Sequence, residues 1–208
     1  MANFADAIEP VQDLGGAISY LTRWLPEDAG QTFVYGTPVE VHSTNGAVMV
    51  WDGTTLAAAI AGFAAENASN LGSAGSGLPV GFSPVLGPGS VVGNYAANPN
   101  QPLAVITPSM VPMSDGGIRF FVASPGTVFI GKLGTSATVT PVATANTLAG
   151  ATYGVTKDTG NSFWYVDTNK TGASSAVTIL GLDPREPVGT VGGHVLFQVL
   201  PAAAQITI

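Results

Sequence analysis

Two histidines and a few acidic residues are the side chains of this sequence that could carry out acid–base chemistry or bind a metal ion. His42 and His194 each stand in a strand-like stretch, and neither has a second candidate ligand three or four residues away. A metal site would therefore need several ligands that converge from distant parts of the chain. We expect both histidines to be ordinary strand residues, and we predict no metal site and no cofactor.

The acidic pairs and the glycine-rich stretches also lack the spacing that catalysis requires. Glu27–Asp28 and the pair Asp183 and Glu186 stand beside prolines or in turns, where acids commonly serve as caps or solvated loop residues. Gly126–Lys132 has the spacing of a P-loop, but Leu133 replaces the Ser or Thr that would hold magnesium. The residues between its glycines are typical of a strand. No Gly-x-Ser-x-Gly elbow occurs either, so we expect that the protein is not an enzyme.

The charge composition excludes several classes of partner. The 208 residues carry 6 basic and 13 acidic side chains, and the charged fraction of 9% is far below the roughly 25% of an ordinary soluble domain. A chain with a net charge of -7 and so few basic residues cannot neutralise a run of phosphates, so we expect no nucleic-acid binding. Its surface must be largely neutral or be covered by another protein.

No stretch of the sequence is typical of a membrane span or a secretion signal. The longest apolar run compatible with a helix, residues 56–65, is much shorter than the roughly 20 residues that cross a bilayer. The first ten residues contain acids where a signal peptide needs basic residues. Cysteine is absent, which excludes disulfides and cysteine–zinc sites. We expect a protein that is made in the cytoplasm and does not contact a membrane.

Alternating apolar residues and frequent turn signals indicate an all-β fold. Short strand-like runs separated by Gly and Pro clusters fill a first β segment, 17–66, and a second, 103–208. The run 31–43 alternates apolar and polar residues, and Asn45-Gly46 after it is a strong hairpin signal. We predict one β-barrel or β-sandwich domain of short antiparallel strands with little helix. The predicted core consists of Phe33, Val39, Val41, Val48, Val50, Phe121, Phe129, Ile130, Trp164, Val166, Ile179, Val195, Phe197 and Val199.

Three segments depart from this β pattern. Residues 1–16 form an acidic N-terminal arm, whose apolar residues would share one stripe of a helix too short to be stable alone. Residues 54–58 predict one helical turn followed by an extended stretch, because Gly62 would cost a helix about 1 kcal/mol. Residues 67–102 form a long Gly- and Pro-rich loop or arm, which carries no charged residue and no histidine.

The uncharged segment 67–102 allows two interpretations. A flexible linker of Gly and Ser would stay soluble without a partner. Disordered segments are usually poor in large apolar residues, however, and this one contains several. We therefore favour an extended arm that buries them against a neighbouring subunit. These residues include Phe82, Leu86, Val92 and Tyr95.

Four short motifs stand out in the strand-like regions. They are Gly-x-Pro-Val at 36–39, Gly-Phe-Ala-x-Glu-x-Ala at 62–68, Trp-x-Val-Asp at 164–167, and Pro-Val-Gly-x-x-Gly-Gly-x-Val-x-Phe at 187–197. With their surroundings, roughly residues 30–67 and 125–203, they resemble the capsid decoration, or cement, proteins of tailed bacteriophages. The resemblance is one of pattern and composition, and it does not cover residues 72–102.

The resemblance implies a β-barrel or β-sandwich protein on the outer surface of the virion capsid, often a homotrimer, that clamps neighbouring subunits of the major capsid protein. Such a protein binds the assembled shell better than its separated parts and needs no catalytic residue. We therefore expect a viral structural protein, made in the host cytoplasm, with the major capsid protein and further copies of itself as partners. The expected contact residues are Phe4, Ile8, Val11, Phe82, Leu86, Val92 and Tyr95.

Two alternative functions fit the same sequence. Phage tail, baseplate and fibre components are also often Gly- and Thr-rich β proteins, and they differ from decoration proteins in having fewer copies per particle. A glycan-binding β module is the second alternative, because aromatic rings can form stacking platforms. Trp24, Trp51, Trp164 and Tyr165 could serve in this way, although tryptophans of β domains more often belong to a core or an interface.

Overall fold

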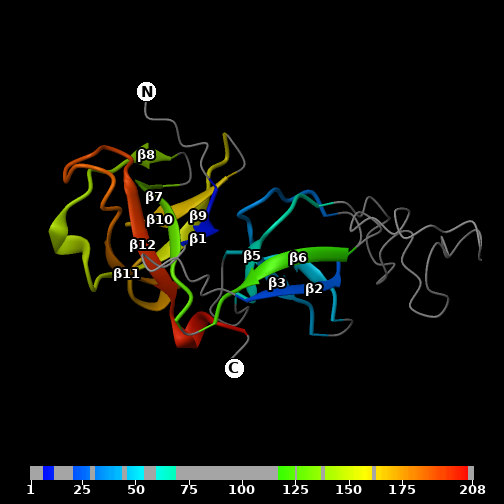
Figure 1. Ribbon diagram of the computed structural model, residues 1–208. Coiled ribbons are helices and arrows are strands. Elements are labelled where there is room, and N and C mark those ends of the chain that lie inside the picture. The colour runs from blue at the N-terminus through cyan, green and yellow to red at the C-terminus, as the bar shows by residue number, and fades with distance from the viewer. Residues whose placement is uncertain are drawn as a thin grey trace, which may run out of the picture.

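The structure is a computed structural model that describes residues 7–11, 21–28, 31–43, 46–53, 60–68, 117–124, 126–136, 139–160 and 163–205. Regular structure in these residues is almost entirely β, in two sheets that lie side by side (Figure 1). This confirms the predicted all-β fold. The helical elements within the described ranges are three short 3-10 turns. They are η3 (Asn146–Leu148), η4 (Gly172–Ser174) and η5 (Pro201–Ala203).

The larger sheet contains a closed five-stranded barrel. Its strands are β7 (Phe129–Thr135), β9 (Thr152–Lys157), β10 (Trp164–Asp167), β11 (Val177–Leu182) and β12 (His194–Val199). They pair in the order β7-β10-β9-β11-β12, and β12 pairs again with β7. Two short strands, β1 (Glu9–Pro10) and β8 (Thr140–Pro141), extend this sheet along β7.

One strand pair of the barrel differs from the antiparallel arrangement that the sequence suggested. β10 runs parallel to β7, whereas the other four pairs of the ring are antiparallel. An odd number of strands cannot alternate in direction all the way around a closed ring. At least one parallel pair is therefore required, and β7–β10 is that pair.

The smaller sheet has five strands in the order β2-β6-β5-β3-β4. They are β2 (Thr22–Pro26), β3 (Pro38–Val41), β4 (Val48–Val50), β5 (Gly62–Ala64) and β6 (Gly117–Val122), and all their pairs are antiparallel. β3 and β4 form the predicted hairpin, with Gly46 at a φ of 70° in its turn. β6, from the second β segment of the sequence, lies between β2 and β5 of the first.

The extended stretch that was predicted after residue 58 is β5, and Gly62 is its first residue. A Cβ atom at Gly62 would lie 2.0 Å from the carbonyl oxygen of Phe121 on β6. Only glycine therefore allows the two backbones to pair this closely. The predicted helical turn at 54–58 lies outside the described residues.

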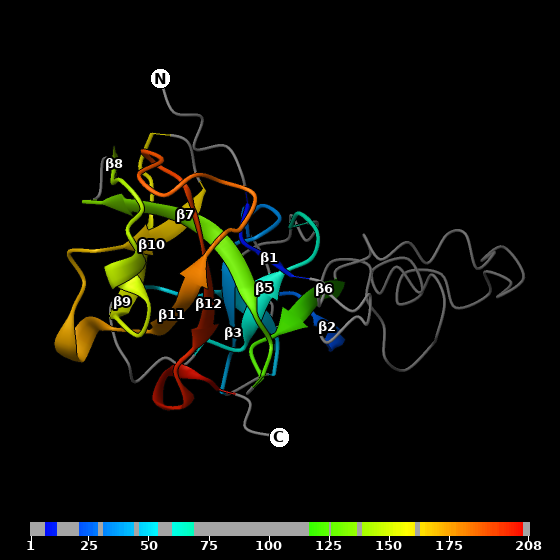
Figure 2. The same ribbon diagram turned by 60° about the vertical axis from the view of Figure 1, so that its left-hand side comes forward.

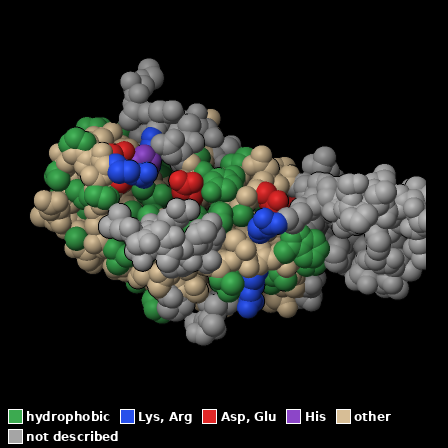
Figure 3. Space-filling model, viewed as in Figure 1, with side chains coloured by type: hydrophobic (Ala, Val, Ile, Leu, Met, Phe, Trp, Pro, Cys, Tyr) green, Lys and Arg blue, Asp and Glu red, His purple; other side chains and the backbone are tan. Residues whose placement is uncertain are grey.

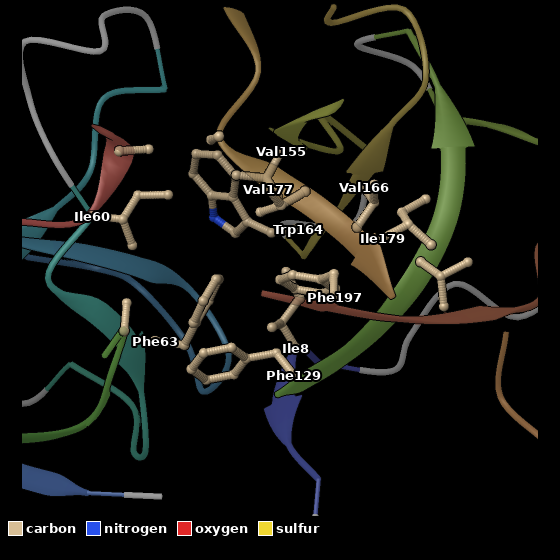
Figure 4. Close-up of a cluster of buried hydrophobic side chains, with 14 of the residues drawn as sticks. Ile8, Ile60, Phe63, Phe129, Val155, Trp164, Val166, Val177, Ile179 and Phe197 are labelled. Atoms are coloured by element: carbon tan, nitrogen blue, oxygen red, sulfur yellow. The ribbon is translucent and has the colours of Figure 1, made fainter. Parts of the chain in front are cut away.

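Both sheets contribute to one hydrophobic core, which Figure 4 shows between them. Phe63 of β5 packs against Phe129 of β7 with ring centroids 4.6 Å apart and against Phe197 of β12 at 6.1 Å. The ring centroid of Trp51, which follows β4, lies 5.9 Å from that of Trp164 on β10. A second cluster lies within the smaller sheet around Phe33, Val39, Val48, Ile118 and Phe120. Every residue of the predicted core is buried or packs partly buried against these clusters.

The N-terminal arm takes an extended form over its described residues, which differs from the expected helical stripe. β1 pairs with β7 where the barrel meets the smaller sheet (Figure 2). Ile8, just before β1, is fully buried in the shared core. A Cβ atom at Gly131 of β7 would lie only 3.1 Å from Ile8 Cγ1, so that glycine leaves room for the isoleucine.

Candidate functional site

The predicted contact residues divide between the core and the part of the chain that the structure does not describe. Ile8 fills the core of its own chain, which corrects its assignment to a partner interface, because pairing of β1 with β7 directs its side chain inward. Val11 is half-buried and lines a groove. Phe4, Phe82, Leu86, Val92 and Tyr95 lie outside the described residues, and their contacts stay predictions.

The groove beside Val11 has a volume of about 520 Å³ and lies between β1 and the loop that follows β11. Its apolar wall includes Pro10, Val11, Phe121 and Leu196, and Tyr35 packs edge-on against Phe121 at 6.0 Å. The Tyr35 hydroxyl donates a hydrogen bond of 3.4 Å to Glu9. A second hollow of about 560 Å³ shares Glu9 and Tyr35 and reaches Glu186 and His194.

Asp183, directly after β11, is 3% exposed and is held by its neighbour Arg185. The Arg185 backbone N–H donates to Asp183 Oδ1 at 3.0 Å, and the guanidinium donates from Nε at 2.9 Å. Arg185 Nη2 lies 2.9 Å from Asp183 Oδ2. These hydrogen bonds from Arg185 lower the pKa of Asp183, although burial of the carboxyl acts in the opposite direction.

Glu186 holds His194 at the start of β12. One carboxylate oxygen accepts a 2.8 Å hydrogen bond from the His194 backbone N–H, and the other lies 2.6 Å from His194 Nδ1. A Cβ atom at Gly193 would lie 2.7 Å from Glu186 Oε2, so glycine gives the carboxylate access to this position. One ligand atom from each of Asp183, Glu186 and His194 falls within 4.8 Å of the others.

The sequence did not reveal this cluster, because His194 stands 8 residues after Glu186, outside a search at three or four residues. The loop between β11 and β12 reverses the chain direction and returns His194 to the side of Asp183. The Asp183 N–H donates to the His194 carbonyl at 3.2 Å. One pattern in the sequence could have indicated the cluster. A turn contains both acids, and a Gly-rich loop then leads into a strand that begins with a histidine.

The same β11–β12 loop carries two protruding apolar side chains. Val188 is 58% exposed and Val191 57%, the highest values among the exposed large hydrophobic residues of the described chain. Hydrogen bonds fix the loop backbone against the segment after β8. Gly189 N–H donates to Thr144 O at 2.8 Å, Thr144 N–H to Thr190 O at 3.0 Å, and Gly192 N–H to Val142 O at 2.8 Å. The loop therefore presents apolar surface on a fixed backbone.

Most of the aromatic residues suggested for glycan stacking are buried. Trp51 and Trp164 pack against each other in the core, and Tyr165 is fully buried. These three rings are therefore unavailable as a surface platform, which corrects that part of the glycan-binding alternative. Trp24 on β2 remains 42% exposed.

The P-loop-like spacing at Gly126–Lys132 belongs to a strand, as its residue types indicated. Phe129 to Lys132 lie in β7, and all four residues are buried. Their backbone groups take part in pairing with β12, so they do not form a phosphate-binding loop. In the described ranges no helix has both the length and the apolar character that a bilayer crossing demands.

Charged side chains are sparse on the surface. On the face that Figure 3 shows, they lie in small groups separated by hydrophobic and neutral side chains. Among the residues that the structure describes, five charged side chains are buried, which reduces the surface charge further: Glu27, Lys132, Asp158, Asp167 and Asp183. No protein-family model matches this sequence, and no curated protein matches it.

Proposed function

We propose that this chain is a non-enzymatic structural protein of a virion, which binds the outer capsid surface and stabilises contacts between major capsid subunits. The observation that carries the proposal is the pair of exposed valines, Val188 and Val191, on a loop whose backbone is fixed by hydrogen bonds. Interface cores are depleted in charge and enriched in apolar area, and a fixed loop loses little conformational entropy when it docks.

The shortage of surface charge supports the same proposal. An ordinary soluble domain has roughly 25% charged residues, but this chain has 9%, and it buries at least five of them. The remaining neutral surface suits contact with another protein. The net charge of -7 also opposes contact with packaged DNA, which favours the outer face of a shell.

The filled barrel supports a structural role. Val166 of β10, Ile179 of β11, Val195 and Phe197 of β12 and their neighbours are fully buried in the shared core. Small barrels of this kind are packed with side chains and have no space for a large ligand. The protein would then act as a rigid unit, bound in many copies as homotrimers, whose separate weak contacts add up through avidity.

Copy number tests this role against that of a tail, baseplate or fibre component. Quantitative mass spectrometry of purified native particles should find the chain in numbers comparable to the major capsid protein. An image reconstruction should place it over the whole outer shell. A low copy number confined to the tail would contradict the proposal and support the tail alternative.

The exposed valines can be tested by binding to purified capsids that lack the protein. The double variant Val188→Asp/Val191→Asp should fold normally, because both side chains are exposed, but its occupancy after co-sedimentation with capsids should fall strongly. Ala173→Asp/Ser174→Asp is the matched control, since it places the same two negative charges on the exposed turn η4. Wild-type occupancy by the double variant would contradict the assignment of this loop to the contact.

A further inference from the structure

We propose that Asp183, Glu186 and His194 form a binding site for one divalent transition-metal ion of the zinc class at the base of the β11–β12 loop. Asp183 directly follows β11, Glu186 lies in the turn, and His194 is the first residue of β12. This site is independent of the proposed capsid role.

The donor set fits this class of ion. One imidazole nitrogen and two carboxylates have ligand atoms within 4.8 Å of one another. Zinc is commonly bound by histidine and carboxylate ligands, whereas magnesium and calcium prefer oxygen ligands alone. The hollow of about 560 Å³ beside these side chains gives an ion access from solvent and leaves room for water at the remaining coordination positions.

The backbone holds the three ligand residues in place. The Asp183 N–H donates to the His194 carbonyl at 3.2 Å, and the Glu186 N–H donates to the Asp183 carbonyl at 3.1 Å. The Glu186 side chain reaches across Gly193 to the His194 backbone N–H. An ion that binds here therefore meets ligands whose positions are already set, and little ordering of the chain is required.

Arg185 is the competitor for this ion. Its guanidinium balances the charge of Asp183, while its side chain is 75% exposed. The Asp183 side chain is only 4% exposed, but the guanidinium already faces water, so it can move away and leave the carboxylate to an ion. Glu9 lines the same hollow and adds negative charge near Arg185. Removal of Arg185 should therefore strengthen metal binding, whereas removal of a ligand should weaken it.

Isothermal titration of the full chain with zinc chloride, in a buffer without chelators, tests the site. Wild type should bind one zinc ion per chain. Asp183→Asn and His194→Gln should each weaken the affinity by about tenfold or more. Arg185→Gln should bind more tightly than wild type. His42→Gln is the matched control and should bind as wild type does, because it removes the other histidine of the chain.

Imidazole signals in NMR spectra give a second readout that does not depend on the ligand variants being folded. The chain has two histidines, so zinc should change the signals of His194 and leave those of His42 unchanged in wild type. Four results would overturn the site: no zinc binding, wild-type affinity in His194→Gln, an equal loss in His42→Gln, or weaker binding in Arg185→Gln. Magnesium binding as tight as zinc binding would overturn the assigned class of ion.

Discussion

Glu40 on β3 is a half-buried acid whose ionisation opposes folding. Burial raises the pKa of its carboxyl, the negative charge of Asp52 raises it further, and His42 acts in the opposite direction. Among the described residues its Oε2 atom is buried without a hydrogen-bond partner. A raised pKa in the folded state means that the unfolded chain holds the carboxylate charge more favourably. The charged form therefore costs folding free energy at neutral pH.

We predict that Glu40→Gln stabilises the protein at neutral pH and has little effect in acid. The gain should appear as the pH rises through the ionisation of glutamate in the unfolded chain, near about 4.3, and should be complete above the raised pKa of the folded state. Urea unfolding at about pH 3 and about pH 7 measures the difference. Glu66→Gln is the control, since Glu66 accepts a hydrogen bond from the Arg119 N–H and should show no gain. A variant less stable than wild type at both pH values would contradict the prediction.

Single residues also show which structural features the sequence patterns can predict. The apolar residues of the strands could be assigned to the core, because alternation directs every second side chain to one face. The partners of His194 could not be assigned, because Asp183 and Glu186 reach it only when β11 and β12 pair. Ile8 was expected at a partner interface and is instead in the core, for the same reason. The pairing of β1 with β7 decides which way the Ile8 side chain points.

The positions of the strands were largely predictable from the sequence, but the residues at which they begin and end were less predictable. β7, β9, β11 and β12 coincide with runs of β-branched and aromatic residues bounded by Gly or Pro clusters. In the run 31–43, however, β3 begins only at Pro38. Tyr35 and Gly36 form a turn, and Gly36 has a φ of 79°. A Cβ atom there would lie 2.6 Å from Ala7 Cβ, so the close approach of the N-terminal arm decides this turn.

β5 and β6 lie on either side of the long uncharged segment and pair with each other. Ala64 is opposite Phe120, and the Ala65 N–H donates to Arg119 O at 2.9 Å. The contacts that pair β5 with β6 therefore do not depend on the length of the segment that connects them. Loop length itself changes the free energy of closure only slowly.

We predict that deletion of residues 72–100 leaves the β fold intact and weakens capsid binding. Circular dichroism and thermal unfolding should resemble those of wild type, because both partners of the β5–β6 pair remain. Capsid occupancy should fall if the uncharged arm contacts a neighbouring subunit. Loss of cooperative unfolding would contradict the first part, and undiminished occupancy would contradict the second.

Side chains that cross between the two sheets hold them together. Phe63 belongs to the smaller sheet, but it packs against Phe129 and Phe197 of the barrel. The Lys170 ammonium adds a polar link, since it donates to Gly53 O at 3.0 Å and to Val155 O at 3.2 Å. We therefore expect the two sheets to unfold together.

We predict that Phe63→Ala lowers the free energy of unfolding by about 3 to 5 kcal/mol, because it leaves a cavity between the sheets. Denaturant unfolding followed by tryptophan fluorescence and by circular dichroism should show one transition with both probes. Val188→Thr, at an exposed position, should change stability by less than about 0.5 kcal/mol. Two separate transitions, with only one of them shifted by Phe63→Ala, would show that the sheets are independent.

The sequence by itself determined the all-β fold, many of the strand residues of the core and the scarcity of charge. These properties follow from local alternation and composition, which act over a few residues. The tertiary structure decided the closure of the barrel, the parallel β7–β10 pair, the burial of Ile8 and the meeting of Asp183, Glu186 and His194. Each of these depends on which strands pair across long separations, and that choice is made by packing of the whole chain and not by any single segment.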